Sequence, residues 1–188
     1  MEISQAQHDV RASYRGGATG TAVSGAVWVA ASATAQWVGI GPAIAVLFVG
    51  GAMIFPLSAL LLRALGGPVG LPRGHPMNAL GTQLAMVVPL GVILAALAAL
   101  DRPEWFFPFA AAIVGAHYFP FVFLYGMKEY AVLGAALVVV GLGLAVAPSG
   151  VTTAGWATGA LELASAPALW ILARRSSLHR PTEQTGSS

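Results

Sequence analysis

Six runs of mostly apolar residues divide the chain, and each is about as long as a bilayer-spanning helix, which needs roughly 20 residues. Short connections containing Gly, Pro or Asp separate the runs, and they force neighbouring helices to run antiparallel. The runs are continuous and show no alternation of polar and apolar residues, which argues against transmembrane strands. The sequence therefore predicts an all-α bundle of six transmembrane helices over residues 19–173. The runs are Thr19–Ile40, Pro42–Leu65, Ala79–Leu100, Trp105–Tyr125, Tyr130–Ala147 and Trp156–Ala173.

The composition leaves little mass for a domain outside the bilayer. Of the 188 residues, 57% are apolar and 9% are charged, and the mean hydropathy is +0.77, whereas soluble domains are about 25% charged. These values exclude a soluble enzyme, a disordered protein and a nucleic-acid-binding module. The chain has no cysteine, so disulfides and thiolate metal sites are excluded. The preference for Arg over Lys, with abundant Ala and Gly, is typical of a GC-rich bacterial genome.

The basic residues predict the orientation of the bundle. With the N-terminus inside, eight Lys and Arg residues fall in cytoplasmic segments and only Arg102 falls outside, which fits the positive-inside rule. Trp37, Trp105 and Trp156 then lie at outer helix ends, as interfacial anchors do. We expect a multi-pass protein of the bacterial inner (plasma) membrane with both termini in the cytoplasm. The cytoplasmic basic residues are Arg11, Arg15, Arg63, Arg73, Lys128, Arg174, Arg175 and Arg180.

The two ends of the chain differ from the apolar runs. Residues 1–18 have apolar positions at helical spacing and predict a short amphipathic helix on the cytoplasmic interface, with a frayed tail as the alternative. Residues 174–188 are polar and predict a disordered cytoplasmic tail. Small-residue triplets near Ala35 leave open a cleaved signal peptide over residues 1–35. Cleavage would leave five transmembrane helices.

Polar side chains inside the apolar runs are the candidate functional residues, because burying them in a bilayer is costly. His117 and Glu162 lie near the middle of the fourth and sixth runs, at heights that we estimate to differ by about 5–8 Å from the helical rise. They form a candidate titrating or cation-coordinating pair on a substrate or ion path, with a purely structural interhelical hydrogen bond as the alternative. Tyr118 belongs to an aromatic stripe beside this pair that is typical of packing, and Gln83 is more typical of a cap or bridge between helices than of a substrate ligand.

Pro56, Pro120 and Pro167 lie inside the second, fourth and sixth runs and are candidate hinges or kinks. The hexapeptides around Pro56 and Pro120 match at four of six positions. A helical hairpin used three times would explain this, but chance matches are common in such apolar, Ala-rich sequence and are the favoured interpretation. Small residues also recur every four positions, as in Gly155 and Gly159. Such faces pack helices within a monomer or form the seam of a homo-oligomer.

The absent motifs argue against enzymatic activity. The chain has no HExxH, GxSxG or phosphate-binding loop, and its single intramembrane His excludes a bis-histidine haem. We therefore expect no cofactor, no metal and no nucleic-acid partner, with the lipid bilayer as the main surrounding.

Two stretches resemble a family of small polytopic bacterial membrane proteins of unknown function. The first runs from Ala6 to Arg15 and on to Trp28, and the second comprises Gly115–Tyr118 with Leu124–Gly126 downstream. The resemblance covers most of the chain and implies a membrane location without implying an activity.

Two functions remain open from the sequence. The first is a small transporter or channel-like permease in which His117 and Glu162 titrate and the three prolines shape a cavity. The second is a non-catalytic membrane scaffold or a regulatory or assembly subunit. A cavity reached by these side chains favours the permease, and a groove of small residues facing lipid favours the scaffold.

Overall fold

The computed structural model describes residues 2–67, 70–147 and 149–178, and this part of the chain is helical without any strand. Seven α-helices and two short 3-10 helices follow one another. The α-helices are α1 (Ile3–Ser13), α2 (Ala18–Trp37), α3 (Ile40–Ala64), α4 (Met77–Ala98), α5 (Phe106–Tyr125), α6 (Glu129–Val146) and α7 (Thr153–Leu178). The 3-10 helices are η1 (Arg15–Gly17) and η2 (Pro103–Trp105).

Five helices among the described residues are long and apolar enough to cross a membrane, namely α3, α4, α5 with η2, α6 and α7. The remaining long helix, α2, has 20 residues but carries Ser and Thr along its length. Several of these polar side chains are buried inside the bundle, including Thr21, Ser24 and Ser32. Two of them donate to carbonyls one turn earlier, Thr21 to Gly17 and Ser32 to Trp28. The lower hydropathy of α2 thus reflects a polar face turned toward other helices.

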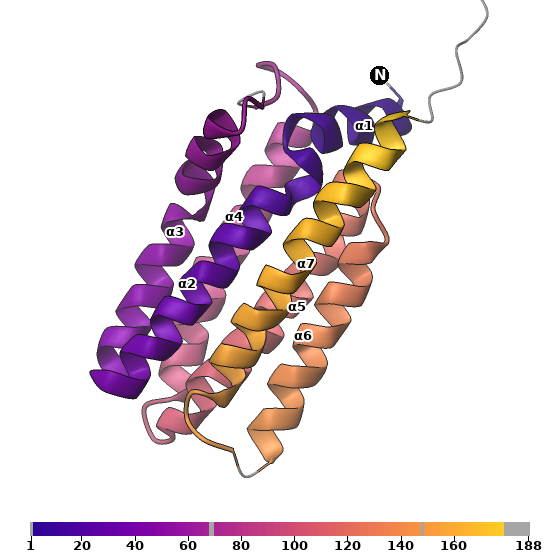
Figure 1. Ribbon diagram of the computed structural model, residues 1–188. Helices are drawn as coiled ribbons and strands as arrows, with labels where there is room; N and C mark the ends of the chain where they lie inside the picture. The colour runs from indigo at the N-terminus through magenta and orange to yellow at the C-terminus, as the bar shows by residue number, and fades with distance from the viewer. Residues whose placement is uncertain (1, 68–69, 148, 179–188) are drawn as a thin grey trace, which may run out of the picture.

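The long helices run antiparallel in a bundle (Figure 1), in which α2 packs on α3 and α7, and α5 packs on α4 and α6. Glycines allow the closest approaches. A Cβ at Gly115 of α5 would lie 2.7 Å from the carbonyl oxygen of Gly134 on α6. A Cβ at Gly25 of α2 would lie 3.1 Å from the carbonyl oxygen of Gly159 on α7. The prediction that small residues pack the monomer is therefore confirmed for Gly159.

Figure 1 shows α1 lying across the end of the bundle where α7 also ends. Ala6 and Val10 of α1 are buried there. Polar side chains of this segment satisfy carbonyls at the ends of other helices: Gln7 donates to the carbonyl of Phe123 at 2.7 Å, and Arg15 donates to the carbonyl of Leu65 at 2.8 Å. Because the last carbonyls of a helix have no partner within it, the bond of Gln7 fixes α1 to α5, and the bond of Arg15 fixes the following η1 to the end of α3.

Two sequence expectations on the ends need correction or lie outside the described residues. The last helix does not stop at Ala173 but continues to Leu178, so the predicted tail over 174–188 is helical in its first five residues, and residues 179–188 are not described.

Pro56, Pro120 and Pro167 lie inside α3, α5 and α7, which continue as helices through them. Each proline removes one backbone donor and leaves the carbonyl four residues earlier without its helical partner.

Candidate intramembrane site

A hydrogen bond between α5 and α7 lies at the centre of the bundle. The hydroxyl of Tyr118 donates to Oε1 of Glu162 over 2.9 Å. Glu162 is completely buried and Tyr118 is 4% exposed. Burial of a carboxyl group is costly without a partner, so this bond stabilises the position of Glu162 against α5.

The carboxyl group of Glu162 is only partly satisfied. Its second oxygen, Oε2, has no hydrogen-bond partner among the described residues, and neither has the hydroxyl of Thr158 one turn earlier on α7. The Ser24 side chain of α2 lies next to the carboxyl group, without completing a hydrogen bond to Oε2. Within the described chain Glu162 forms no ion pair. This buried acidic group therefore has no basic partner among the described side chains, and one of its oxygens is unpaired. Proteins keep such an arrangement mainly where it has a role.

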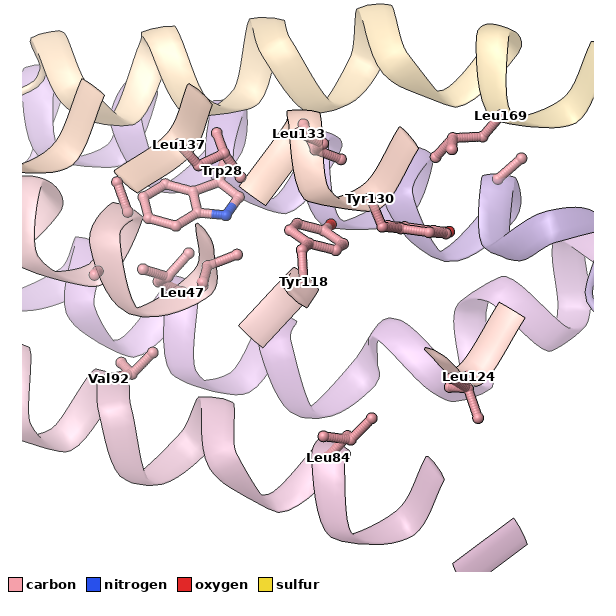
Figure 2. Close-up of a cluster of buried hydrophobic side chains, with 14 of the residues drawn as sticks. Trp28, Leu47, Leu84, Val92, Tyr118, Leu124, Tyr130, Leu133, Leu137 and Leu169 are labelled. Atoms are coloured by element: carbon pink, nitrogen blue, oxygen red, sulfur yellow. The ribbon is translucent and has the colours of Figure 1, made fainter. Parts of the chain in front are cut away.

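Aromatic rings surround the Tyr118 side of this bond. The rings of Tyr118 and Tyr130 stack with their centroids 5.7 Å apart, and Figure 2 shows both side chains in the interior of the bundle. Tyr125 stacks on the other side of Tyr130 at 5.3 Å, and Phe121 meets Tyr118 edge-to-face at 5.5 Å. Tyr130 donates to the carbonyl of Gly16 over 2.6 Å. The aromatic stripe thus packs inside the bundle, and the ring contacts hold Tyr118 in place.

A cavity of about 670 Å³ lies between the α2–α3 pair and the α4–α5 pair. Tyr118 forms part of its wall, together with Thr21 and Ser24 of α2. Trp28, Leu47, Val92 and Leu124, labelled in Figure 2, also line it. Ligand pockets in proteins span roughly 300–1,000 Å³ and combine apolar walls with a few polar groups. The volume and lining of this cavity match that description, and Tyr118 connects it to the buried carboxyl group.

His117 lies on the cavity wall and does not contact Glu162. Its ring meets the ring of Phe121 edge-on at 4.8 Å, and its Nδ1 is buried without a hydrogen-bond partner. The described residues contain no hydrogen bond or ion pair between His117 and Glu162. The expected direct pair is therefore not formed, because the neighbouring residue Tyr118, about 100° further round the helix, is the one turned toward α7.

The other sequence candidates are separate from this site. Gln83 is exposed on α4 and does not line the cavity. No group of three or more His, Asp or Glu residues that could hold a metal ion is formed within the described ranges. Sequence analysis did not single out Thr21 and Ser24, although their spacing of three residues on α2 places both on one helical face. This spacing is the sequence feature from which the polar face of α2 could have been predicted.

Comparison with known proteins identifies a family but no activity. The model of a family of unknown function (DUF7010) matches residues 3–172. The chain belongs to this family. The match agrees with the predicted resemblance in covering most of the chain and in implying no activity. Neither a curated protein nor a solved structure matches the chain.

Proposed function

We propose that this member of a family of unknown function is a small permease of the bacterial inner membrane that takes a small molecule into the cavity beside Tyr118. The single observation that carries the proposal is the cavity of about 670 Å³, because a fully packed bundle would have no place for a solute. No catalysed reaction is part of the proposal. Glu162 acts as a positioning residue, since it reaches the cavity only through its hydrogen bond to Tyr118.

The proposed topology has six transmembrane helices, α2 to α7, with both termini in the cytoplasm. The inward-facing polar residues of α2 support its inclusion, because they need not meet lipid. The charges support the orientation: Arg11 and Arg63 lie in segments at the α1 end of the bundle, and Arg102 lies at the opposite end. In this orientation α1 lies at the cytoplasmic interface.

Cysteine labelling tests the permease directly, since the natural chain has no cysteine. Thr21→Cys and Ser24→Cys, made one at a time, place a thiol on the cavity wall. Each variant is exposed to an uncharged, sugar-linked methanethiosulfonate, which does not cross the bilayer, in right-side-out and in inside-out vesicles. Ser4→Cys, on the exposed side of α1, reports the orientation of the vesicles, and Val132→Cys, 71% exposed on α6, is the lipid-facing control.

A permease whose cavity opens to each side in turn predicts labelling of both cavity cysteines from both faces of the membrane. Ser4→Cys should react only from the cytoplasmic face and Val132→Cys from neither. Cavity cysteines that react from one face only, or from neither face while Ser4→Cys reacts, would contradict the permease.

A membrane scaffold is the second candidate function, and one observation favours it. A shallow groove of about 430 Å³ runs between α2, α3 and α7 and is lined by small residues such as Ala18, Ala22 and Ala166. Such faces allow another helix to approach closely. For the scaffold we expect Ala22→Leu to disrupt a complex in mild detergent, measured by light scattering. Val132→Leu, on the exposed face of α6, is the control. An unchanged mass for Ala22→Leu would exclude this groove as the contact.

A further inference from the structure

The cavity wall carries no formal charge. Among the described residues that line it, none is Asp, Glu, Lys or Arg. The polar part of the lining consists of hydrogen-bonding groups without a fixed charge, including Thr21, Ser24, Tyr118 and the imidazole of His117. The carboxyl group of Glu162 is completely buried behind Tyr118 and does not line the cavity. A charged solute would lose its hydration here without gaining a counter-charge, which is costly in a medium of low polarity.

Ser58 of α3 and Asn78 and Thr82 of α4 also line the cavity. Their side chains donate to backbone carbonyls close to them in the sequence.

The buried polar groups and the exposed apolar groups of the lining lie at different places in the cavity. Thr21, Ser24 and Tyr118 are each less than a tenth exposed, so they form the inner wall. Phe55 of α3 and Met86 of α4 line the same cavity but are 64% and 60% exposed on the outside of the bundle. These two residues therefore mark a lateral mouth between α3 and α4.

The helix packing agrees with a mouth at this position. Helix α3 packs mainly on α2 and helix α4 mainly on α5, while α3 and α4 touch each other much less. Few side chains of α3 are buried, and its outer face is apolar. In a bilayer both helices bordering the mouth would be in contact with acyl chains, so the mouth would open to lipid and not to water.

We infer that the cavity takes up an uncharged amphiphile from the bilayer through the α3–α4 mouth. Its hydroxyl group would donate to the oxygens of Thr21, Ser24 or Tyr118, and its apolar end would lie at Phe55 and Met86. This inference rests on the proposed function and adds the substrate class and the route of entry. The volume of about 670 Å³ corresponds to roughly 20 units of water size, at about 30 Å³ each. A medium-chain alcohol or a compact lipid-soluble molecule fits this volume, whereas a whole two-chain phospholipid does not.

Quenching of Trp28 fluorescence tests the substrate class. Trp28 lines the cavity and is only 2% exposed, so bromine atoms dissolved in the surrounding lipid do not reach its ring. A single-tryptophan variant keeps Trp28 and replaces the other four with Phe. In phosphatidylcholine nanodiscs, this variant is titrated with three probes of equal chain length that carry bromine beside the polar group: 2-bromododecanol, 2-bromododecanoate and 2-bromododecyltrimethylammonium.

We expect the alcohol to quench Trp28 at least twofold and saturably, and the two charged probes to quench it less than a third as strongly. Quenching by the carboxylate or the ammonium probe equal to that by the alcohol would overturn the substrate class, while a cavity that binds solutes would remain. Absence of quenching by all three probes would also overturn the inference. The permease proposal itself would still be judged separately by the cysteine labelling at Thr21 and Ser24.

Substitutions at the mouth test the route. Gly51 and Gly81 line the cavity from α3 and α4, and a Cβ added at either meets no atom within 4 Å. Gly51→Leu with Gly81→Leu should therefore fill the mouth without disturbing the backbone and lower the quenching by the alcohol at least threefold. Gly143→Leu is the matched control, because Gly143 also has free space but lies on α6 outside the cavity. Unchanged quenching in the double variant, with the folded protein confirmed by circular dichroism, would exclude entry between α3 and α4.

Discussion

Replacing Tyr118 by Phe removes a single oxygen from the centre of the bundle and tests the hydrogen bond that connects the cavity to Glu162. The ring of Phe keeps the stacking on Tyr130, where the centroids lie 5.7 Å apart. The substitution deletes the donor that Oε1 of Glu162 accepts over 2.9 Å. Because Oε2 of the same carboxyl group has no partner in the described chain, the carboxyl group would then keep only the Ser24 side chain as a polar neighbour.

The size of the effect follows from these two contributions. A hydrogen bond between membrane helices contributes about 0.6 kcal/mol on average and up to about 1.7 kcal/mol. Leaving a buried acceptor unpaired costs about 1–3 kcal/mol in soluble proteins. We expect Tyr118→Phe to lower the free energy of unfolding by about 1–2 kcal/mol. This lies toward the upper part of the membrane range because Oε2 of the same carboxyl group is already unpaired.

A double-mutant cycle isolates the bond from other effects of the substitution. Tyr118→Phe, Glu162→Met and the double variant are unfolded in mixed micelles by increasing sodium dodecyl sulfate, and the loss of helix is followed by circular dichroism. We expect a coupling energy of about 1 kcal/mol between the two positions. Tyr125→Phe is a matched control, because it also removes one buried tyrosine oxygen but not the bond to Glu162. A coupling energy within about 0.3 kcal/mol of zero would refute the assignment of this hydrogen bond.

Three further predictions follow from the packing. Gly115→Ala should destabilise the bundle by about 1–3 kcal/mol, as overpacking does, because the new Cβ would lie 2.7 Å from the carbonyl oxygen of Gly134. The control is Gly143→Ala, where the new Cβ has free space, and it should leave the unfolding curve in sodium dodecyl sulfate unchanged. Gln7→Ala should lower the free energy of unfolding by about 1 kcal/mol, since it removes the donor to the end of α5. It should also speed hydrogen exchange in α1, and equal exchange rates would show that this bond does not hold α1 in place. His117→Ala should change the free energy of unfolding by less than about 1 kcal/mol, because loss of the edge-on contact with Phe121 is offset by removal of the buried, unpaired Nδ1. A larger loss of stability in thermal unfolding would identify His117 as architectural.

The helices themselves could be predicted closely from the sequence. The run predicted over Tyr130–Ala147 corresponds to α6 over Glu129–Val146, because a long apolar segment bounded by breakers has few alternatives to a helix. The last helix was predicted to end too early. The polar residues after Ala173 indicate where the chain leaves the bilayer, but they do not indicate where the backbone hydrogen bonds of the helix stop. Residues after Ala173 can continue the helix outside the apolar region.

The site was predicted only in part. Glu162 and Tyr118 were both singled out, but helical rise gives height along the bundle and not the rotation of each helix. The rotation of α5 depends on packing such as the contact of Gly115 with Gly134, and that contact cannot be derived from one sequence. The cavity could not be predicted either, because it results from the weak packing of α3 on α4, and both helices have the apolar composition of well-packed ones.

Labelling of Ser24→Cys with and without the cavity filled tests the central claim of an open cavity inside the bundle most directly. The rate of reaction with a small methanethiosulfonate is compared between Ser24→Cys alone and Ser24→Cys combined with Gly51→Leu and Gly81→Leu, all of which lie on the cavity wall. An open cavity predicts a measurable rate for the single variant and a rate at least tenfold lower once the leucines fill the space. Equal rates in the two proteins, or no reaction in either while Ser4→Cys reacts, would contradict the account.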